Sequence, residues 1–220
     1  MSLEEVWESF IEEIYVITMN HGVLVHGLVM MSNHFHLILS TPESDLGIVM
    51  RELLGTLTRS LNRKSGRSGR IFTGRYKWSL IATSDYYSAA YKYVYRNPVK
   101  AGICGRVEDY PFSTINVLTG QRRTPLPLSY PLMGAGDALL PEDPGRLLEW
   151  LNQPYSAETD RAIAFGVRRS SFRFPEDRVL RKEAIPQDLK WAEKEKVSVT
   201  FWFSSAPIDA DLNQKVTDTF

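Results

Sequence analysis

The chain of 220 residues has a single cysteine, Cys104, and no apolar run near the roughly 20 residues that a membrane-spanning helix needs. One cysteine excludes an internal disulfide and a cysteine-rich zinc site. A reducing cytoplasm is therefore the expected compartment, and no membrane partner is expected. Glycine and proline, with 14 and 12 residues, are too few for a collagen-like or low-complexity chain. The chain is long enough to bury a core.

Positive charge is also missing, but only from one part of the chain. Residues 1–50 contain seven acids and no Lys or Arg, whereas residues 51–106 contain twelve Lys or Arg and two acids, a net charge of +10. The whole chain is nevertheless neutral, with 26 residues of each sign. A basic block inside a neutral protein is typical of a surface that binds a polyanion such as nucleic acid. The alternative is a solvated helix face followed by a basic loop.

Hydrophobic spacing predicts a mixture of helices and strands. The expected helices are 3–15, 46–61, 85–97, 145–152, 157–168 and 187–196, the third of which should stop at Pro98. The expected strands are 23–31, 34–39, 70–72, 76–82 and 197–203, of which the first two should form an antiparallel hairpin. Residues 121–145 are rich in Pro and Gly, which is typical of a linker.

Two of the four histidines, His34 and His36, alternate along an expected strand. Residues i and i+2 of a strand project from the same face, so two imidazoles can converge on one cation while Phe35 packs on the opposite face. The alternative is a pair of half-exposed histidines on a sheet surface. His26, on the preceding strand, is expected to be buried and structural.

The helix expected over 85–97 carries five tyrosines. Helical spacing puts Tyr93 and Asn97 on one stripe, and Tyr87 and Tyr91 on a neighbouring stripe that suits the core. The amide oxygen of Asn97 is a hard ligand suited to a divalent cation, and Tyr93 would lie beside it. A phenol with a pKa of about 10 is a poor nucleophile at neutral pH unless a metal polarises the phosphate that it attacks. A purely structural aromatic stripe is the alternative.

Three segments together resemble the REP-associated tyrosine transposases of the HUH single-tyrosine superfamily, in which U is a hydrophobic residue. They are 31–37 (MSNHFHL), 74–77 (GRYK) and 93–102 (YVYRNPVKAG), in the order and spacing of that family. Residues 109–114 (DYPFST) are similar to the segment that follows in the family. The match covers roughly residues 20–120.

The resemblance implies a ferredoxin-like α+β fold, an antiparallel sheet with helices on one face, for a catalytic domain over residues 1–120. The linker 121–145 and a mostly helical C-terminal extension over 146–220 would follow it. Family members usually open with a further strand before the first helix, whereas this sequence begins almost directly in a helix at Leu3. Three alternatives are open: that strand is absent, is supplied by residues 197–203, or is supplied by another chain.

The resemblance also implies a Mg²⁺ or Mn²⁺ ion held by His34, His36 and Asn97. Tyr93 would attack a phosphate of single-stranded DNA, leaving a 5′-phosphotyrosine and a free 3′-hydroxyl. The implied partners are short repeats that fold as DNA hairpins, which suggests a nucleoid-associated protein, and monomer and homodimer both stay open. Two other functions remain: a hairpin-DNA-binding protein that has lost its catalytic activity, and a metal-dependent phosphodiesterase that uses water.

The basic block gains a role from this resemblance. Arginines and lysines of a Gly/Ser-rich loop can close on phosphates, and aromatic rings near them can stack on bases. The residues expected to contact DNA are Arg63, Lys64, Arg67, Arg70, Arg75, Tyr76, Lys77 and Trp78.

Overall fold

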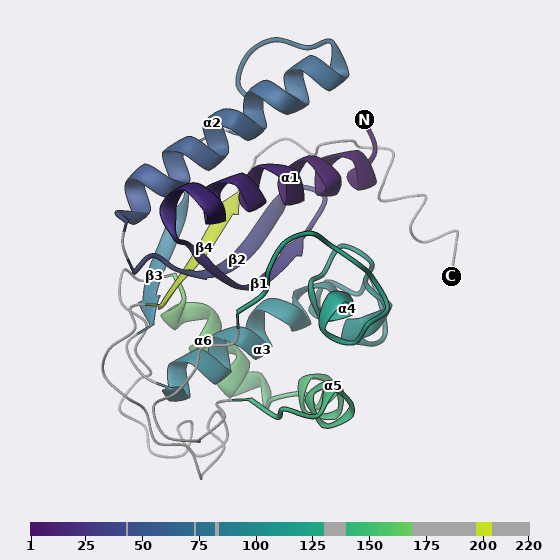
Figure 1. The fold of residues 1–220 in the computed structure, drawn as a ribbon. Helices are drawn as coiled ribbons and strands as arrows, with labels where there is room; N and C mark the ends of the chain where they lie inside the picture. The colour runs from purple at the N-terminus through teal and green to yellow at the C-terminus, as the bar shows by residue number, and fades with distance from the viewer. Residues whose placement is uncertain (43, 73, 82–83, 130–139, 169–196, 204–220) are drawn as a thin grey trace.

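The computed structural model describes residues 1–42, 44–72, 74–81, 84–129, 140–168 and 197–203, and its architecture is α+β (Figure 1). The helices are α1 (Leu3–His21), α2 (Leu46–Ser65), α3 (Ser84–Lys100), α4 (Ile115–Leu118), α5 (Pro144–Asn152) and α6 (Ala157–Gly166), with a 3₁₀ turn, η1, at Val107–Asp109. The strands are β1 (Leu24–Met30), β2 (His34–Ser40), β3 (Lys77–Ile81) and β4 (Val197–Phe203). The expected helix over 187–196 lies outside the described residues. Within them, no helix combines the length and the apolar character that crossing a membrane requires.

The four strands form one antiparallel sheet in the order β1–β2–β4–β3 (Figure 1). The hairpin of β1 and β2 is the one that the sequence predicts. β4, the last strand of the described chain, lies between β2 and β3: His36 is paired with Phe201, which is paired in turn with Lys77. Residues 197–203, one of the three sources considered for a further strand, therefore lie inside the sheet.

Helices cover both faces of this sheet, with α1 and α2 on one side and α3 on the other (Figure 1). Leu37 and Leu39 of β2 belong to the core under α1 and α2, whereas Val29 and Ile38 belong to the core under α3. The expectation of helices on a single face is therefore wrong. Strands enclosed in this way bury both sets of side chains, which explains why β1 and β2 are nearly continuous apolar runs.

The chain that follows α3 closes the outer edge of β1. The N–H of Thr114 donates to the carbonyl of Leu28 at 2.9 Å, and the N–H of Ser129 donates to the carbonyl of Val25 at 2.8 Å. A strand edge covered in this way cannot pair with another chain. Part of the expected linker, whose residues 130–139 lie outside the described ranges, therefore packs against the sheet.

α1 and α2 run longer than predicted because each continues to a glycine that can end it. Gly22 and Gly66 adopt left-handed φ values of 60° and 64°, a conformation that ends many helices. Arg63 and Lys64, which were expected in a flexible loop, therefore lie on the last turn of α2. Residues 70–72, expected as a strand, form none.

Pro98 lies inside α3 instead of ending it. Proline lacks the N–H that would otherwise bond to the carbonyl of Val94, four residues earlier. The side chain of Asn97 compensates: its Nδ2 donates to the carbonyl of Tyr93 at 2.7 Å and to that of Val94 at 3.4 Å. The expected stop at Pro98 is therefore wrong, because a side-chain donor replaces the missing backbone donor and the helix continues to Lys100.

A column of buried tyrosines holds α3 on the sheet. The ring centroids of Tyr87 and Tyr91 are 5.7 Å apart, and those of Tyr91 and Tyr95 are 4.6 Å apart. Tyr95 reaches β1 beside a bulge between Val25 and Gly27, where a Cβ added to Gly27 would lie 2.8 Å from the tyrosine hydroxyl. The close approach of α3 therefore depends on a residue without a side chain. The predicted core role of Tyr87 and Tyr91 is confirmed.

His26 is buried and structural, as predicted. Its Nδ1 lies 2.6 Å from the carbonyl oxygen of Ser129, and its Nε2 lies 2.7 Å from the hydroxyl of Ser40. Burial lowers the pKa of His26 to about 4, so the imidazole is neutral at pH 7 and both ring nitrogens have partners inside the fold.

We expect Gly27→Ala to lower the free energy of unfolding by about 1–3 kcal/mol, because the new methyl group overpacks against the Tyr95 ring. Gly55→Ala is a matched control, since a Cβ on this α2 residue meets only the flexible side chain of Arg59, at 3.5 Å. The control should raise the stability by about 0.5–1 kcal/mol, because alanine is the better helix former. Urea unfolding followed by circular dichroism measures both, and equal effects would contradict the close approach of Tyr95.

Candidate active site

His34 and His36 face each other at the start of β2. Their Nε2 atoms are 3.1 Å apart, their ring centroids are 4.8 Å apart, and the ring planes meet at 89°. Two metal–nitrogen bonds of roughly 2.1 Å that meet near a right angle separate the nitrogens by about 3 Å. The pair therefore has the spacing of two ligands of one ion.

Both imidazoles are neutral at pH 7. Burial lowers the pKa of His34 to about 4 and holds the pKa of His36 well below its usual value, and the neighbouring imidazole lowers the pKa of His36 further. The Nδ1 of His34 lies 2.6 Å from Oδ1 of Asn33. An amide oxygen only accepts, so Nδ1 carries the proton and Nε2 carries the lone pair. A neutral imidazole oriented by a hydrogen bond at its other nitrogen is the form that binds a metal.

One flank of α3 brings Tyr93 and Asn97 to this pair. The ring centroid of Tyr93 lies 6.0 Å from that of His36, with the planes at 83°. The side chain of Asn97 hydrogen-bonds to His36 and raises its pKa against the effect of burial, as an amide oxygen does when it accepts the imidazole N–H. The stripe expected from helical spacing therefore reaches the histidines that alternate along β2.

The Tyr93 phenol is half-buried and protonated at neutral pH. Burial raises its pKa, Arg168, which follows α6, lowers it, and Asp160 of α6 raises it again. The ammonium of Lys100 lies 5.2 Å from the centroid of the ring. Tyr93 thus contacts the sheet through His36 and feels charges from the C-terminal part of the chain, and it must lose its proton before it can act as a nucleophile.

The donor atoms around His36 fit a divalent cation. The described residues contain no group of three or more His, Cys, Asp and Glu side chains that could hold a metal. Two neutral imidazoles and the amide oxygen of Asn97 are a different set of candidate ligands, and the 3.1 Å between the two Nε2 atoms suits an ion such as Mg²⁺ or Mn²⁺ once the N–H of His36 that faces the site is lost. Nitrogen and amide ligands of this kind do not select between the two ions.

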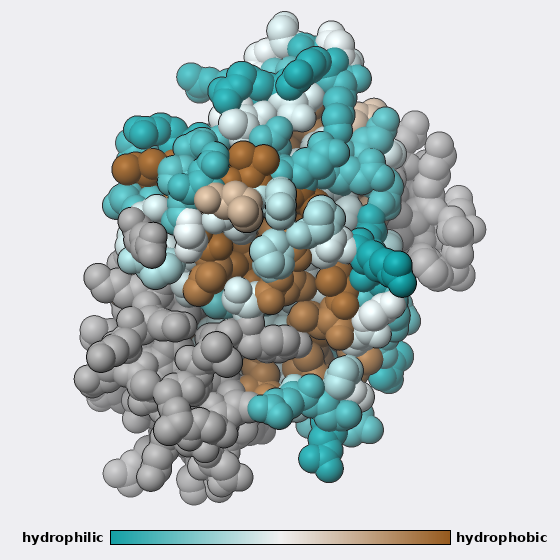
Figure 2. Space-filling view, viewed as in Figure 1, coloured by the Kyte–Doolittle hydropathy of each residue, from teal (hydrophilic) through white to brown (hydrophobic). Residues whose placement is uncertain are grey.

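The residues expected to bind DNA occupy the end of α2, the loop after it and β3. Seven of the eight are exposed, and Tyr76 is half-buried. Figure 2 shows hydrophilic residues gathered over the upper end of α2 and its loop. Lys64 has contacts inside the fold, because its Nζ lies 2.9 Å from the hydroxyl of Ser9 and 3.5 Å from a carboxylate oxygen of Glu12. This lysine therefore ties α2 to α1.

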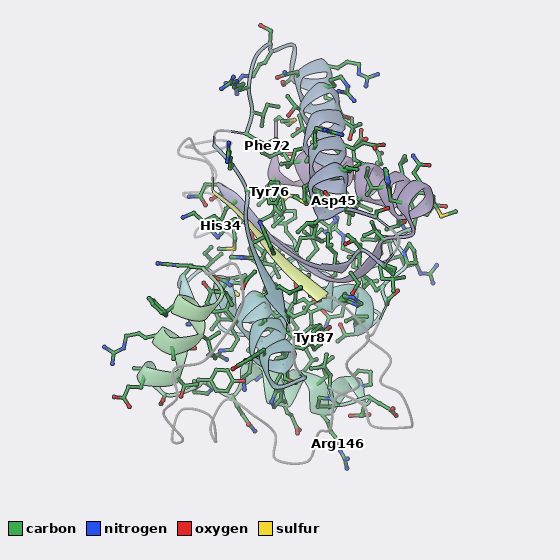
Figure 3. All side chains as sticks on the ribbon, turned by 90° about the vertical axis from the view of Figure 1, so that its left-hand side faces the viewer. His34, Asp45, Phe72, Tyr76, Tyr87 and Arg146 are labelled. Carbon is green, nitrogen blue, oxygen red and sulfur yellow. The ribbon has the colours of Figure 1, made fainter. Side chains whose placement is uncertain are left out.

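β3 begins at the same end of the sheet as His34, and Figure 3 labels His34 and Tyr76 there. Lys77 and His36 share the partner Phe201, and residues paired across an antiparallel ladder lie on one face. Lys77 therefore belongs to the face of the histidine pair, and the adjacent Trp78, 42% exposed, belongs to the opposite face. The sequence analysis assigned Lys77 and Trp78 to one DNA-binding surface, but they lie on opposite faces of the sheet.

Two cations of the basic block are buried, which the sequence analysis missed. Lys92 and Arg96 of α3 are 2% and 7% exposed. The Nζ of Lys92 lies 4.8 Å from the ring centroid of Trp150 and 4.4 Å from that of Tyr155. Burial lowers the pKa of Lys92 to about 8, and Arg96 contributes in the same direction. The spacing of Lys92, Arg96 and Lys100, four residues apart, was the available sign of a shared partner.

Comparison with family models, with curated proteins and with solved structures finds no match for this chain. The functional interpretation therefore depends on the geometry of the site and on the sequence motifs.

The lowered pKa of Lys92 predicts a stability that rises with pH. Between the folded-state pKa of about 8 and the ordinary value of 10.5, the unfolded chain holds a proton that the folded chain has lost. The free energy of unfolding should therefore gain about 2 kcal/mol between pH 8 and pH 10 from this group. Lys92→Met removes the titration and keeps the aliphatic stem.

Chemical denaturation of the wild type and Lys92→Met at both pH values isolates this contribution, because the tyrosines titrate in both proteins. The stability difference between them should shift in favour of the wild type as pH rises. A stability difference between the two proteins that does not change with pH would contradict the desolvation of Lys92 by α5.

Proposed function

We propose that this chain is a metal-assisted enzyme that cleaves and rejoins DNA strands with Tyr93 as its nucleophile, in line with its resemblance to the HUH single-tyrosine transposases. The observation that carries the proposal is the meeting of β2 and α3 at one point. His34 and His36 come from the strand, and Tyr93 and Asn97 come from the helix. A phenol beside two neutral imidazoles and an amide oxygen is a suitable set of groups for transesterification at a phosphate.

Each of these residues has a separate role in the proposed reaction. His34, His36 and Asn97 would hold a divalent cation, which when bound polarises the scissile phosphate. Tyr93 gives up its proton and its oxygen bonds to phosphorus, while the bond to the 3′ oxygen breaks and that oxygen leaves as a 3′-hydroxyl once protonated. The phosphotyrosine keeps the phosphodiester energy, so attack by another 3′-hydroxyl rejoins a strand without ATP.

Single-stranded or hairpin DNA is the proposed substrate, and its transposition or a domesticated derivative of that process near the nucleoid is the proposed setting. Exposed cations at the end of α2 and around the start of β3 can contact phosphates, and the exposed ring of Trp78 can stack on a base. The cations are Arg63, Arg67, Arg70, Arg75 and Lys77.

The central test is a covalent adduct with a hairpin oligonucleotide that has a single-stranded flank. With Mg²⁺ or Mn²⁺, the wild type should form a denaturation-resistant adduct that chelation prevents. Tyr93→Phe should lose it entirely and keep its DNA affinity, because it removes only the hydroxyl. Tyr86→Phe removes a half-buried hydroxyl from the same helix and should keep the adduct. His34→Ala should lose the adduct but not DNA affinity, because the phosphate contacts lie elsewhere.

The same assay separates the other two functions. Cleavage that survives Tyr93→Phe would indicate a phosphodiesterase that uses water. Hairpin binding by the wild type without cleavage under any metal condition would indicate a DNA-binding protein.

The exposed arginines predict steeply salt-dependent binding to single strands. Each neutralised phosphate adds a slope of about −0.7 to the dependence of log affinity on log salt. The double variant Arg63→Ala and Arg67→Ala should therefore reduce the magnitude of the slope by about 1.4, whereas Arg51→Ala, an exposed change near the other end of α2, should leave it unchanged. Fluorescence anisotropy over a salt series measures the slopes. If the double variant and Arg51→Ala change the salt slope equally, the end of α2 does not contact the DNA.

A further inference from the structure

The helices α5 and α6 hold α3 through three cations spaced four residues apart. Lys92 is enclosed by the aromatic rings described above. Arg96 Nη1 donates to two carbonyls of the last turn of α5 at 2.9 and 2.8 Å, where the helix dipole is negative. Lys100 Nζ lies 2.9 Å from Oδ1 of Asp160 in α6. This row of cations lies on the side of α3 away from the tyrosine column, and Tyr93 lies on the flank between them.

Lys100 contacts Tyr93 as well as α6. Its ammonium is 5.2 Å from the centroid of the Tyr93 ring, within the range in which a cation is attracted to an aromatic face. The side chains of Lys100 and Asp160 are 29% and 24% exposed, so the pair is partly shielded from water. The carboxylate restrains a long side chain that would otherwise sample many rotamers.

We propose that the Lys100–Asp160 pair positions the ring of Tyr93 against His36, which makes α6 a part of the active site. The inference rests on the proposed role of Tyr93 as the nucleophile. The ring contacts the imidazole of β2 and an ammonium that α6 holds in place. Contacts with His36 of β2 and with an ammonium that α6 restrains limit the two side-chain torsions of the tyrosine, and a nucleophile held near its attack geometry reacts faster.

Direct binding of a DNA phosphate is the other role that a lysine at this place suggests. The carboxylate of Asp160 argues against it, because an ammonium that is already paired at 2.9 Å offers little net charge to a phosphate. The two roles also differ in their kinetic effect. A positioning residue changes the rate of bond formation in bound DNA, whereas a phosphate contact changes the DNA affinity and its salt dependence.

Three variants test the pair. Lys100→Met removes the ammonium and keeps the stem, Lys100→Arg keeps a cation, and Asp160→Asn removes its charged partner. At saturating hairpin DNA, Lys100→Met should slow adduct formation by about tenfold to a hundredfold, with DNA affinity within about twofold of the wild type. Asp160→Asn should have a smaller effect in the same direction, and Lys100→Arg should largely restore the rate.

Arg161→Met is the matched control, because it removes an exposed cation from α6 whose Nε donates to the carbonyl of Ala157, in the same helix, at 3.1 Å. It should leave the rate unchanged. Lower affinity and a shallower salt slope in Lys100→Met, with an unchanged rate at saturation, would assign Lys100 to phosphate binding and overturn the proposal.

A readout without DNA separates failure of this inference from failure of the proposed function. The ring carbons of Tyr93, followed by NMR in ¹³C-tyrosine-labelled protein and assigned with Tyr93→Phe, should shift in Lys100→Met but not in Arg161→Met, and should return in Lys100→Arg. If the wild type forms no adduct, the proposed function fails and these signals still decide whether the pair holds the ring. Unchanged Tyr93 signals in Lys100→Met would overturn the positioning role.

Discussion

The candidate site depends on one constraint, the packing of α3 against the sheet. Tyr95 occupies the space that Gly27 leaves at the bulge of β1, and this contact, with the rest of the tyrosine column, sets the rotation of the helix. On the opposite side, α5 and α6 hold the cations of α3. Tyr93 and Asn97 lie on the flank between these two packed sides of α3. They can therefore meet His36 only while both sides of the helix keep their contacts.

The sheet that carries the histidines is completed by the last described strand. β4 separates β2 from β3, and its register aligns Lys77 with His36 through their common partner Phe201. A central strand must satisfy backbone groups on both of its edges. The candidate site and the basic start of β3 are therefore related in space by residues 197–203, more than a hundred positions away from either β2 or β3.

Several features of the site were predictable, because they follow from local periodicity. His34 and His36 share a face of a strand because the side-chain period is two, and Tyr93 and Asn97 share a helix flank because they are four residues apart. The end of α3 was not predictable in this way. Pro98 favours a stop on backbone grounds alone, and the hydrogen bond from Asn97 that offsets its missing N–H depends on a side-chain rotamer that no residue pattern encodes.

The sequence by itself determined the chemical groups, the elements that carry them and the faces on which they lie, since these depend on neighbours within a few residues. The tertiary structure decided that the histidine face and the flank of α3 meet, that helices cover both sides of the sheet, and that Lys92 is buried while Arg63 is exposed. Such outcomes depend on contacts between residues far apart in the chain, where burial and register, rather than residue type, decide which partner each side chain has.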